Sequence, residues 1–155
     1  MKCTVKVSVA YDTKYGNTKL VAENIVSGLR EVKALDVAIS DVDKIDIDSV
    51  ADFDVILIGA PNHFGRPSRK ITKFIEKLGK LDLEGKQVAV FDTYLGKDFE
   101  KAVKKMEERI NNKTSLQIIT PGLSIRVEDM KGPVTEGELH KSKEFGKKIA
   151  IQLMK

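Results

Sequence analysis

Short runs of consecutive hydrophobic residues alternate along this chain with segments in which hydrophobic residues recur every three or four positions. The runs have the length of strands, and the three-to-four spacing places apolar side chains on one face of a helix. Such alternation from end to end is typical of a fold in which helices connect the strands of a parallel sheet. No linker or internal repeat interrupts the pattern, so it predicts a single domain over residues 1–155.

Five strands are predicted from the hydrophobic runs, at residues 4–10, 35–39, 54–59, 88–91 and 116–119. The third is the best candidate for the centre of the sheet, because Val55 to Ile58 contain no polar residue and a central parallel strand is covered on both faces. After the fifth run comes Pro121, which lacks the N–H that a strand ladder requires. We therefore expect a bend there, or a short continuation over residues 123–127.

Four helices are predicted from periodic stripes of apolar residues, at about residues 17–32, 71–78, 99–110 and 135–154. Right-handed connections between the strands then give an α/β fold with a three-layer, doubly wound, five-stranded parallel sheet. The strand order 2-1-3-4-5 is a natural choice for such a sheet, although periodicity alone does not establish it.

Composition excludes several classes of protein. With 41% hydrophobic and 32% charged residues, the chain lacks the bias of disordered, collagen-like or disulfide-scaffold proteins. Its single cysteine, Cys3, cannot form an internal disulfide or a cysteine-rich metal site, and we expect it to be buried as a small hydrophobic residue. No apolar run approaches the roughly 20 residues that span a membrane. Together these features favour a cytoplasmic location.

The net charge of +4 is unevenly distributed. Residues 1–60 carry 7 basic and 10 acidic side chains, whereas residues 61–155 carry 20 basic and 13 acidic side chains. We interpret the aspartates between Asp36 and Asp54 as a solvated loop face rather than a docking patch. The chain has no tryptophan and only 6% aromatic residues, and this composition argues against nucleic-acid binding by base stacking.

Ligands of open α/β sheets bind beyond the carboxyl ends of the strands, beside the point where the strand order reverses. Three loops are predicted there, at residues 12–17, 60–67 and 92–97. The first opens directly into a helix and contains Gly16, which permits a tight turn, so hydroxyls and free N–H groups converge at the positive helix end. This arrangement predicts a phosphate site. The alternative is ordinary helix capping by Asn17 or Thr18.

Other phosphate-related motifs do not match. No G-x-G-x-x-G occurs, and residues 79–87 only imitate a P-loop, because their glycines are one residue too far apart and Gln87 replaces the magnesium-binding Ser/Thr. ATP hydrolysis is therefore unsupported. A response-regulator receiver domain is also excluded, since it needs an acceptor aspartate where the third strand here ends in Gly59, Ala60 and Pro61.

The three loops together resemble the flavodoxin family. The first resembles the T-x-x-G-N-T loop that holds the 5′-phosphate of FMN, and its residues are Thr13, Lys14, Tyr15, Gly16, Asn17 and Thr18. The second resembles a loop whose aromatic residue lies against the isoalloxazine ring, and its residues are Pro61, Asn62, His63, Phe64 and Gly65. The third resembles the loop that carries a second stacking aromatic residue, and its residues are Asp92, Thr93, Tyr94, Leu95 and Gly96.

This resemblance covers essentially the whole chain. Residues 127–133 and the helix containing Gly146 look like the carboxyl end of flavodoxin domains fused to di-iron proteins. Two features depart from the family: flavodoxins are usually strongly acidic, and many carry threonine where this chain has Lys14 and Tyr15. These departures affect the expected identity of the partner protein more than the expected choice of cofactor.

The resemblance implies a flavodoxin-like fold, FMN as the cofactor, and electron transfer between protein donors and acceptors. It implies no metal, no catalytic residue of the chain's own, no membrane or nucleic-acid partner, and a monomer or weak homodimer. An alternative is an FMN-dependent NAD(P)H:quinone or flavin reductase, because P-x-x-F-G at residues 61–65 is similar to a loop of flavodoxin-like quinone reductases. A flavin-free docking module is a third hypothesis, which the intact first loop opposes.

Some residues of the loops have two interpretations. Phe64 and Tyr94 either stack on the flavin or cover the core. His63 is either a proton donor near flavin N5 or a solvated loop histidine. Asp92 either caps the turn that follows it or accepts a hydrogen bond from the ribityl chain or the ring, and capping is the simpler expectation.

Overall fold

The computed structural model describes residues 4–155, so Cys3 lies outside the described residues. One sheet contains the strands β1 (Val5–Tyr11), β2 (Leu35–Asp41), β3 (Val55–His63), β4 (Arg66–Pro67), β5 (Gln87–Tyr94), β6 (Gln117–Ile118) and β7 (Leu123–Arg126). The α-helices are α1 (Asn17–Leu29), α2 (Arg69–Leu78), α3 (Lys101–Lys113) and α4 (Glu138–Leu153). Two short 3₁₀ helices, η1 (Val42–Lys44) and η2 (Ile47–Asp52), follow β2.

The sheet order confirms the predicted topology. Strands β2, β1, β3 and β5 are parallel neighbours in that order, and β5 is followed by β6 and β7 at the edge. β6 pairs with β5 at Gln87 and Val88, and β7 pairs with it farther along, from Phe91 to Tyr94. The predicted fifth strand is therefore divided into two parts, with Pro121 in the gap between them.

The predicted count of five strands also omits the hairpin formed by β3 and β4. β3 continues to His63, the chain turns at Phe64 and Gly65, and β4 pairs antiparallel with Asn62 and His63. A strand of two residues is too short to carry a hydrophobic period, so periodicity could not reveal it.

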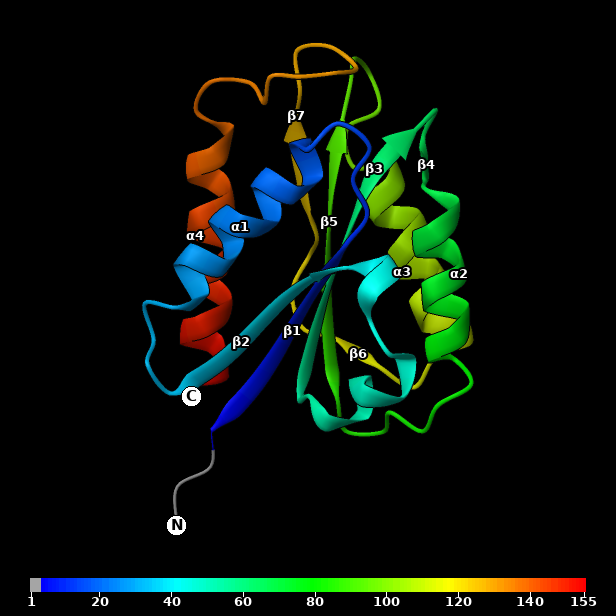
Figure 1. The fold of residues 1–155 in the computed structure, drawn as a ribbon, viewed down its shortest axis with the longest axis vertical. Coiled ribbons are helices and arrows are strands. Elements are labelled where there is room, and N and C mark those ends of the chain that lie inside the picture. Colours follow the sequence, from blue (N-terminus) through cyan, green and yellow to red (C-terminus); the bar gives the residue numbers. More distant parts are fainter. Residues whose placement is uncertain (1–3) are drawn as a thin grey trace.

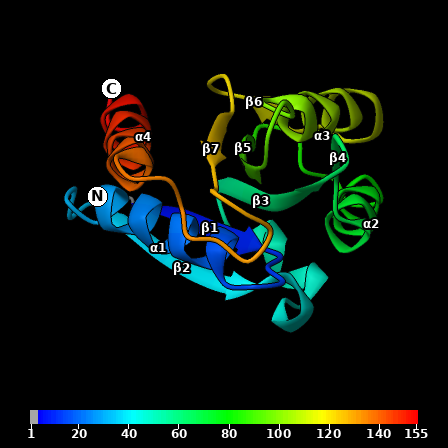
Figure 2. The same ribbon diagram turned by 90° about the horizontal axis from the view of Figure 1, so that it is seen from above.

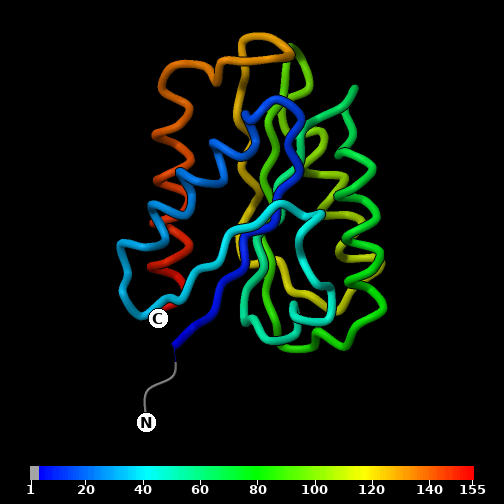
Figure 3. Tube along the Cα trace, viewed as in Figure 1, coloured from blue at the N-terminus to red at the C-terminus, as the bar shows by residue number. Residues whose placement is uncertain are grey.

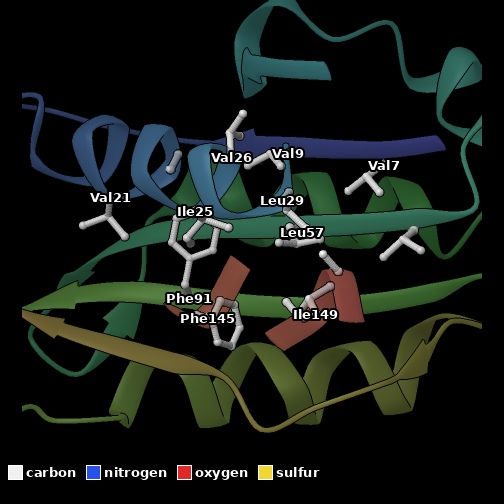
Figure 4. Close-up of a cluster of buried hydrophobic side chains, with 14 of the residues drawn as sticks. Val7, Val9, Val21, Ile25, Val26, Leu29, Leu57, Phe91, Phe145 and Ile149 are labelled. Carbon is white, nitrogen blue, oxygen red and sulfur yellow. The ribbon is translucent and has the colours of Figure 1, made fainter. Parts of the chain in front are cut away.

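Helices cover both faces of the sheet, which gives the predicted three layers (Figures 1 and 2). α1 and α4 lie against one face, and α2 and α3 lie against the other. The first face buries a cluster that includes Ile25, Leu57 and Phe91 (Figure 4). The second buries a separate cluster around Ile58 and Met106. Within residues 4–155, none of the helices has the length and apolarity that crossing a membrane requires.

Some element boundaries differ from the predicted ones. α1 ends at Leu29, three residues early, and α4 begins at Glu138, three residues late. Phe99 lies before α3 rather than on its apolar face, and 56% of its surface is exposed. Its ring instead packs edge-on against Tyr94, with the ring centroids 5.4 Å apart.

The acidic segment after β2 is partly helical rather than a plain loop. The carboxylate of Asp41 accepts the N–H of Asp43, and that of Asp46 accepts the N–H of Asp48. These contacts cap η1 and η2, because each carboxylate satisfies an N–H of the first turn. Asp41 and Asp46 thus have a local structural role.

The helices α1 and α4 approach each other so closely that two glycines are required. A Cβ atom on Gly146 would lie 2.1 Å from the carbonyl oxygen of Ile25, and one on Gly28 would lie 2.1 Å from that of Lys143. Both neighbours are backbone atoms, so relief would require the helices to separate.

We expect Gly146→Ala to lower the free energy of unfolding by about 2–3 kcal/mol, the upper part of the range for overpacking. Urea denaturation followed by circular dichroism measures the change. Ser27→Ala, on the exposed side of α1, is the control and should stay within about 0.5 kcal/mol of the parent. An unchanged midpoint for Gly146→Ala would contradict the close approach of the two helices.

Candidate functional site

A cavity of about 370 Å³ lies among the loops that follow β1, β3, β5 and β7, which come together at one end of the molecule (Figure 3). Most of the predicted site residues line it: Thr13, Lys14, Tyr15, Asn17, Thr18, Pro61, Asn62, His63, Phe64, Thr93, Tyr94 and Leu95. Gly16, Gly65 and Gly96 belong to the same loops but do not line the cavity. Three segments far apart in the sequence are thus brought together.

The first turn of α1 faces this cavity without a capping side chain. Gly16 occupies the N-cap position with φ of 92°, a left-handed conformation that favours glycine. Neither Asn17 nor Thr18 caps the helix, and the first turn contains no acidic residue. The Thr13 hydroxyl accepts the Gly16 N–H at 2.9 Å, which closes the loop before the helix. The positive end of the helix is therefore available to an anion.

Two lysines add positive charge next to the helix end. The Nζ atoms of Lys14 and Lys131 lie 5.4 Å and 5.9 Å from the ring centroid of Tyr15, which is exposed. Lys131 comes from the loop after β7, so its position could not be inferred from the first loop alone. Both lysines would attract an anionic ligand, as the positive end of α1 does.

Side-chain contacts fix the first loop relative to its neighbours. The hydroxyls of Thr18 and Thr93 form a buried hydrogen bond of 2.9 Å between α1 and β5. On the other side, Gly132 has φ of 102°, and a Cβ atom there would lie 2.6 Å from Oδ1 of Asn17. Glycine at position 132 therefore leaves space for the amide of Asn17.

The second loop is the turn of the β3–β4 hairpin. The Asn62 side chain stabilises it, since Oδ1 accepts the Gly65 N–H at 2.7 Å and Nδ2 donates to the carbonyl of Asp98 at 3.0 Å. Phe64 occupies the tip with a positive φ of 53°, and 95% of its surface is exposed. It does not cover the core, which was one of its two interpretations. His63 is also exposed beside the cavity.

The third loop supplies aromatic and apolar surface. Tyr94 ends β5 and is partly buried, and burial raises the pKa of its hydroxyl. Its ring meets that of Phe99 at an interplanar angle of 69°. Leu95 follows at the rim and is 39% exposed. This side of the cavity is therefore suited to a flat apolar group.

Asp92 is the predicted site residue that the structure places elsewhere. It is fully buried and does not line the cavity. Its carboxylate accepts the Ser124 hydroxyl at 2.6 Å and the Val103 N–H, in the first turn of α3, at 3.0 Å. Burial raises its pKa to about 7, although both hydrogen bonds oppose the rise. The carboxylate therefore caps α3, 11 residues along the chain, rather than the turn directly after Asp92, and both of its oxygens accept hydrogen bonds from within the protein.

Three residues that sequence reasoning did not propose also line the cavity, namely Asp98, Val127 and Met130. Val127 and Met130 belong to the segment 127–133, whose likeness to the carboxyl end of flavodoxin domains was the available signal. Asp98 is held beside the cavity by its backbone carbonyl, which accepts a hydrogen bond from the Asn62 side-chain amide. A backbone contact of this kind leaves no signal in the sequence.

The fold and the cavity together define a class of protein. The strand order reverses between β1 and β3, and the cavity lies at the carboxyl ends of these strands. This is the position at which doubly wound α/β proteins bind ligands. The protein is thus a doubly wound α/β protein with a ligand cavity at its topological switch point.

The family follows from comparison with known proteins. A model of the flavodoxin domain matches residues 8–125, more than half of the chain, so the protein belongs to the flavodoxin family. A flavodoxin of Aquifex aeolicus is 34% identical over 91 residues, which cover 57% of this chain and 49% of that protein. An NAD(P)H dehydrogenase (quinone) of Caulobacter vibrioides is 30% identical over 99 residues, covering 52% of this chain and 50% of the relative. The chain aligns with only about half the length of each relative.

Solved structures agree with this placement. A flavodoxin from the domain Archaea superposes with a TM-score of 0.82 at 26% identity, covering 97% of this chain and all of the other. A flavodiiron core from Synechocystis and a flavodiiron protein from Giardia intestinalis are also structural neighbours, with TM-scores of 0.77 and 0.81 at 15% and 17% identity, which shows a shared fold alone. Proteins of this family bind flavin and carry electrons to redox partners.

Proposed function

We propose that this protein binds FMN and carries electrons between redox partner proteins. The observation that carries the proposal is the uncapped, positive end of α1 at a cavity whose lining also contains Phe64 and Tyr94. FMN would supply the redox chemistry, and the protein would bind and orient it. Membership of the flavodoxin family supports the same conclusion.

The residues present fit both ends of this cofactor. At the phosphate end, the free N–H groups of the first turn of α1 and the hydroxyls of Thr13 and Thr18 would hold the phosphate oxygens. At the ring end, Tyr94 and Phe64 offer aromatic surface on two different loops. Apolar cover there would exclude water from the ring.

A titration of the purified apoprotein with FMN tests the proposal. We expect one-to-one quenching of flavin fluorescence by FMN, and much weaker binding of riboflavin, which lacks the phosphate. Equal binding of both flavins would contradict the role of α1. No quenching by either would overturn the flavoprotein proposal and leave the flavin-free docking module.

A quinone or flavin reductase is the second candidate function. The Caulobacter relative and the P-x-x-F-G sequence at residues 61–65 favour it. Steady-state oxidation of NADPH with a quinone acceptor separates the two functions. We expect almost none for an electron carrier, whereas steady turnover by the FMN-loaded protein would establish the reductase.

We further propose that the protein works in the cytoplasm as a monomer or weak homodimer. The single cysteine supports a reducing compartment. Sedimentation velocity at several protein concentrations measures the oligomeric state, and a stable tetramer would contradict the expectation.

A further inference from the structure

A second hollow in the surface, which we call the basic groove, lies between α2 and α3 beside β4. It has a volume of about 650 Å³, larger than the cavity of the candidate site. Its lining contains five basic side chains and one acidic one, Glu108. The basic residues are Arg66, Arg69, Lys105, Arg109 and Lys113. Figure 1 shows α2 and α3 side by side on this face of the sheet.

Most of this charge is not neutralised within the chain. Arg109 pairs with Glu76 across the two helices, with Nη1 and Oε2 2.8 Å apart. Within residues 4–155, the other four basic residues of the groove form no ion pair, and all four are exposed. Other lysines at the ends of the same helices do pair, as Lys70 does with Asp43 at 2.6 Å. The groove therefore presents an excess of positive charge to solvent.

Helix stability does not explain the position of Arg69, at the end of the groove where α2 begins. Arg69 is in the first turn of α2, which contains no acidic residue and has no side-chain cap. A cation at that end opposes the helix dipole, which favours acidic residues there. The helix dipole therefore explains Lys113, which lies in the last turn of α3, but not Arg69, whose position an external partner accounts for better.

The groove is continuous with the rim of the candidate site. Arg66 pairs with His63 across the β3–β4 hairpin, so one strand of the hairpin lines the cavity and the other lines the groove. The hairpin tip carries Phe64, which is 95% exposed. Leu95, Phe99 and Met130 are further exposed apolar side chains of the neighbouring loops. An apolar rim with a basic flank is suited to a protein partner.

We propose that the basic groove binds an acidic surface of a redox partner protein and so places the partner's redox centre against the Phe64 tip. The proposal rests on the proposed electron-transfer function and adds the charge and location of the partner. A small anion fits the groove less well, because none of its lining residues is buried and the charges are spread over two helices and a hairpin. Glu108 among them would also repel it.

Binding is tested with a plant-type [2Fe–2S] ferredoxin, an acidic one-electron carrier, in its diamagnetic gallium-substituted form. Amide resonances of the ¹⁵N-labelled protein are followed with and without FMN. We expect shifts at β4, α2, α3 and the Phe64 tip, and an affinity that falls at least tenfold between about 20 and 300 mM salt, because salt screens such attraction. Cytochrome c, a basic carrier, should bind much more weakly.

Two charge-matched double variants separate the groove from net charge. Lys105→Glu with Lys113→Glu should weaken ferredoxin binding at least fivefold at low salt. Lys148→Glu with Lys155→Glu, on α4 and at the end of the chain, makes the same change in net charge and should weaken it less than twofold. Both variants should bind FMN as the parent does, because none of these lysines lines the cavity.

Three results would overturn the proposal: equal weakening by both double variants, stronger binding of cytochrome c than of ferredoxin, or shifts confined to another face. Dimerisation at low salt that Lys105→Glu with Lys113→Glu abolishes would also overturn it, since the groove would then hold the acidic segment of a second copy. Failure of the electron-transfer function is distinguishable, because gallium-substituted ferredoxin would still bind the groove while FMN either did not bind or accepted no electron from native, reduced ferredoxin.

Discussion

Replacing Asn17 with aspartate should weaken FMN binding roughly two hundredfold without weakening the fold. Asn17 lines the cavity from the first turn of α1, which contains no acidic residue. A new carboxylate about 5 Å from a phosphate charge, at an effective dielectric constant of about 20, would repel it by about 3 kcal/mol. Aspartate has the shape of asparagine, so its space beside Gly132 is unchanged.

The effects on stability and on binding should have opposite signs. A negative charge at a helix N-terminus stabilises the helix by about 0.3–1 kcal/mol, so the apoprotein should unfold at the same or slightly higher urea concentration. Fluorescence titration measures FMN and riboflavin affinities, and riboflavin should bind to the variant as to the parent. Asn24→Asp, two turns along α1, is the matched control. Equal losses for both flavins would show that the phosphate does not lie at the end of α1.

The contribution of Asp92 to stability should fall as pH rises from about 4 to 7. Burial raises the pKa of this carboxyl group from 3.8 to about 7 in the folded protein. Between these values the unfolded chain has lost the proton and the folded protein retains it, so raising the pH favours unfolding. The contribution is fully present below pH 4 and is lost as pH passes 7. Integrated over this window, it amounts to about 4 kcal/mol.

Comparison with Asp92→Asn isolates this contribution, because asparagine has no proton to lose. The stability of the parent relative to that of the variant should fall by about 4 kcal/mol between pH 4 and pH 7.5. Urea unfolding at half-unit pH intervals measures both proteins. Asp82→Asn, at an exposed aspartate, is the control and should follow the parent. A constant difference between parent and Asp92→Asn would show that the carboxyl group ionises in the folded protein as it does in the unfolded chain.

The loops of the candidate site were largely predictable, because each follows directly from a hydrophobic strand. A run such as Val55 to Ile58 must be covered on both faces, so its end marks an edge of the sheet where a ligand can bind. The short sequence Thr13 to Thr18 then indicated a phosphate site through its glycine and its position before a helix. Met130 and Lys131 were harder to predict, since Met130 lines the cavity and Lys131 lies over the Tyr15 ring from a loop over one hundred residues later.

The sequence by itself determined the α/β class, the order of its elements and the three loops that meet at the switch point, because hydrophobic period and turn residues act locally. Only the tertiary structure decided the direction of the Asp92 side chain. It faces α3 because Ser124 and the N–H of Val103 offer hydrogen bonds in a buried place. The basic groove is also a tertiary feature, since Lys105 becomes a neighbour of Arg66 and Arg69 only when α2 and α3 pack on the sheet. Long-range packing sets both outcomes, and no local pattern encodes them.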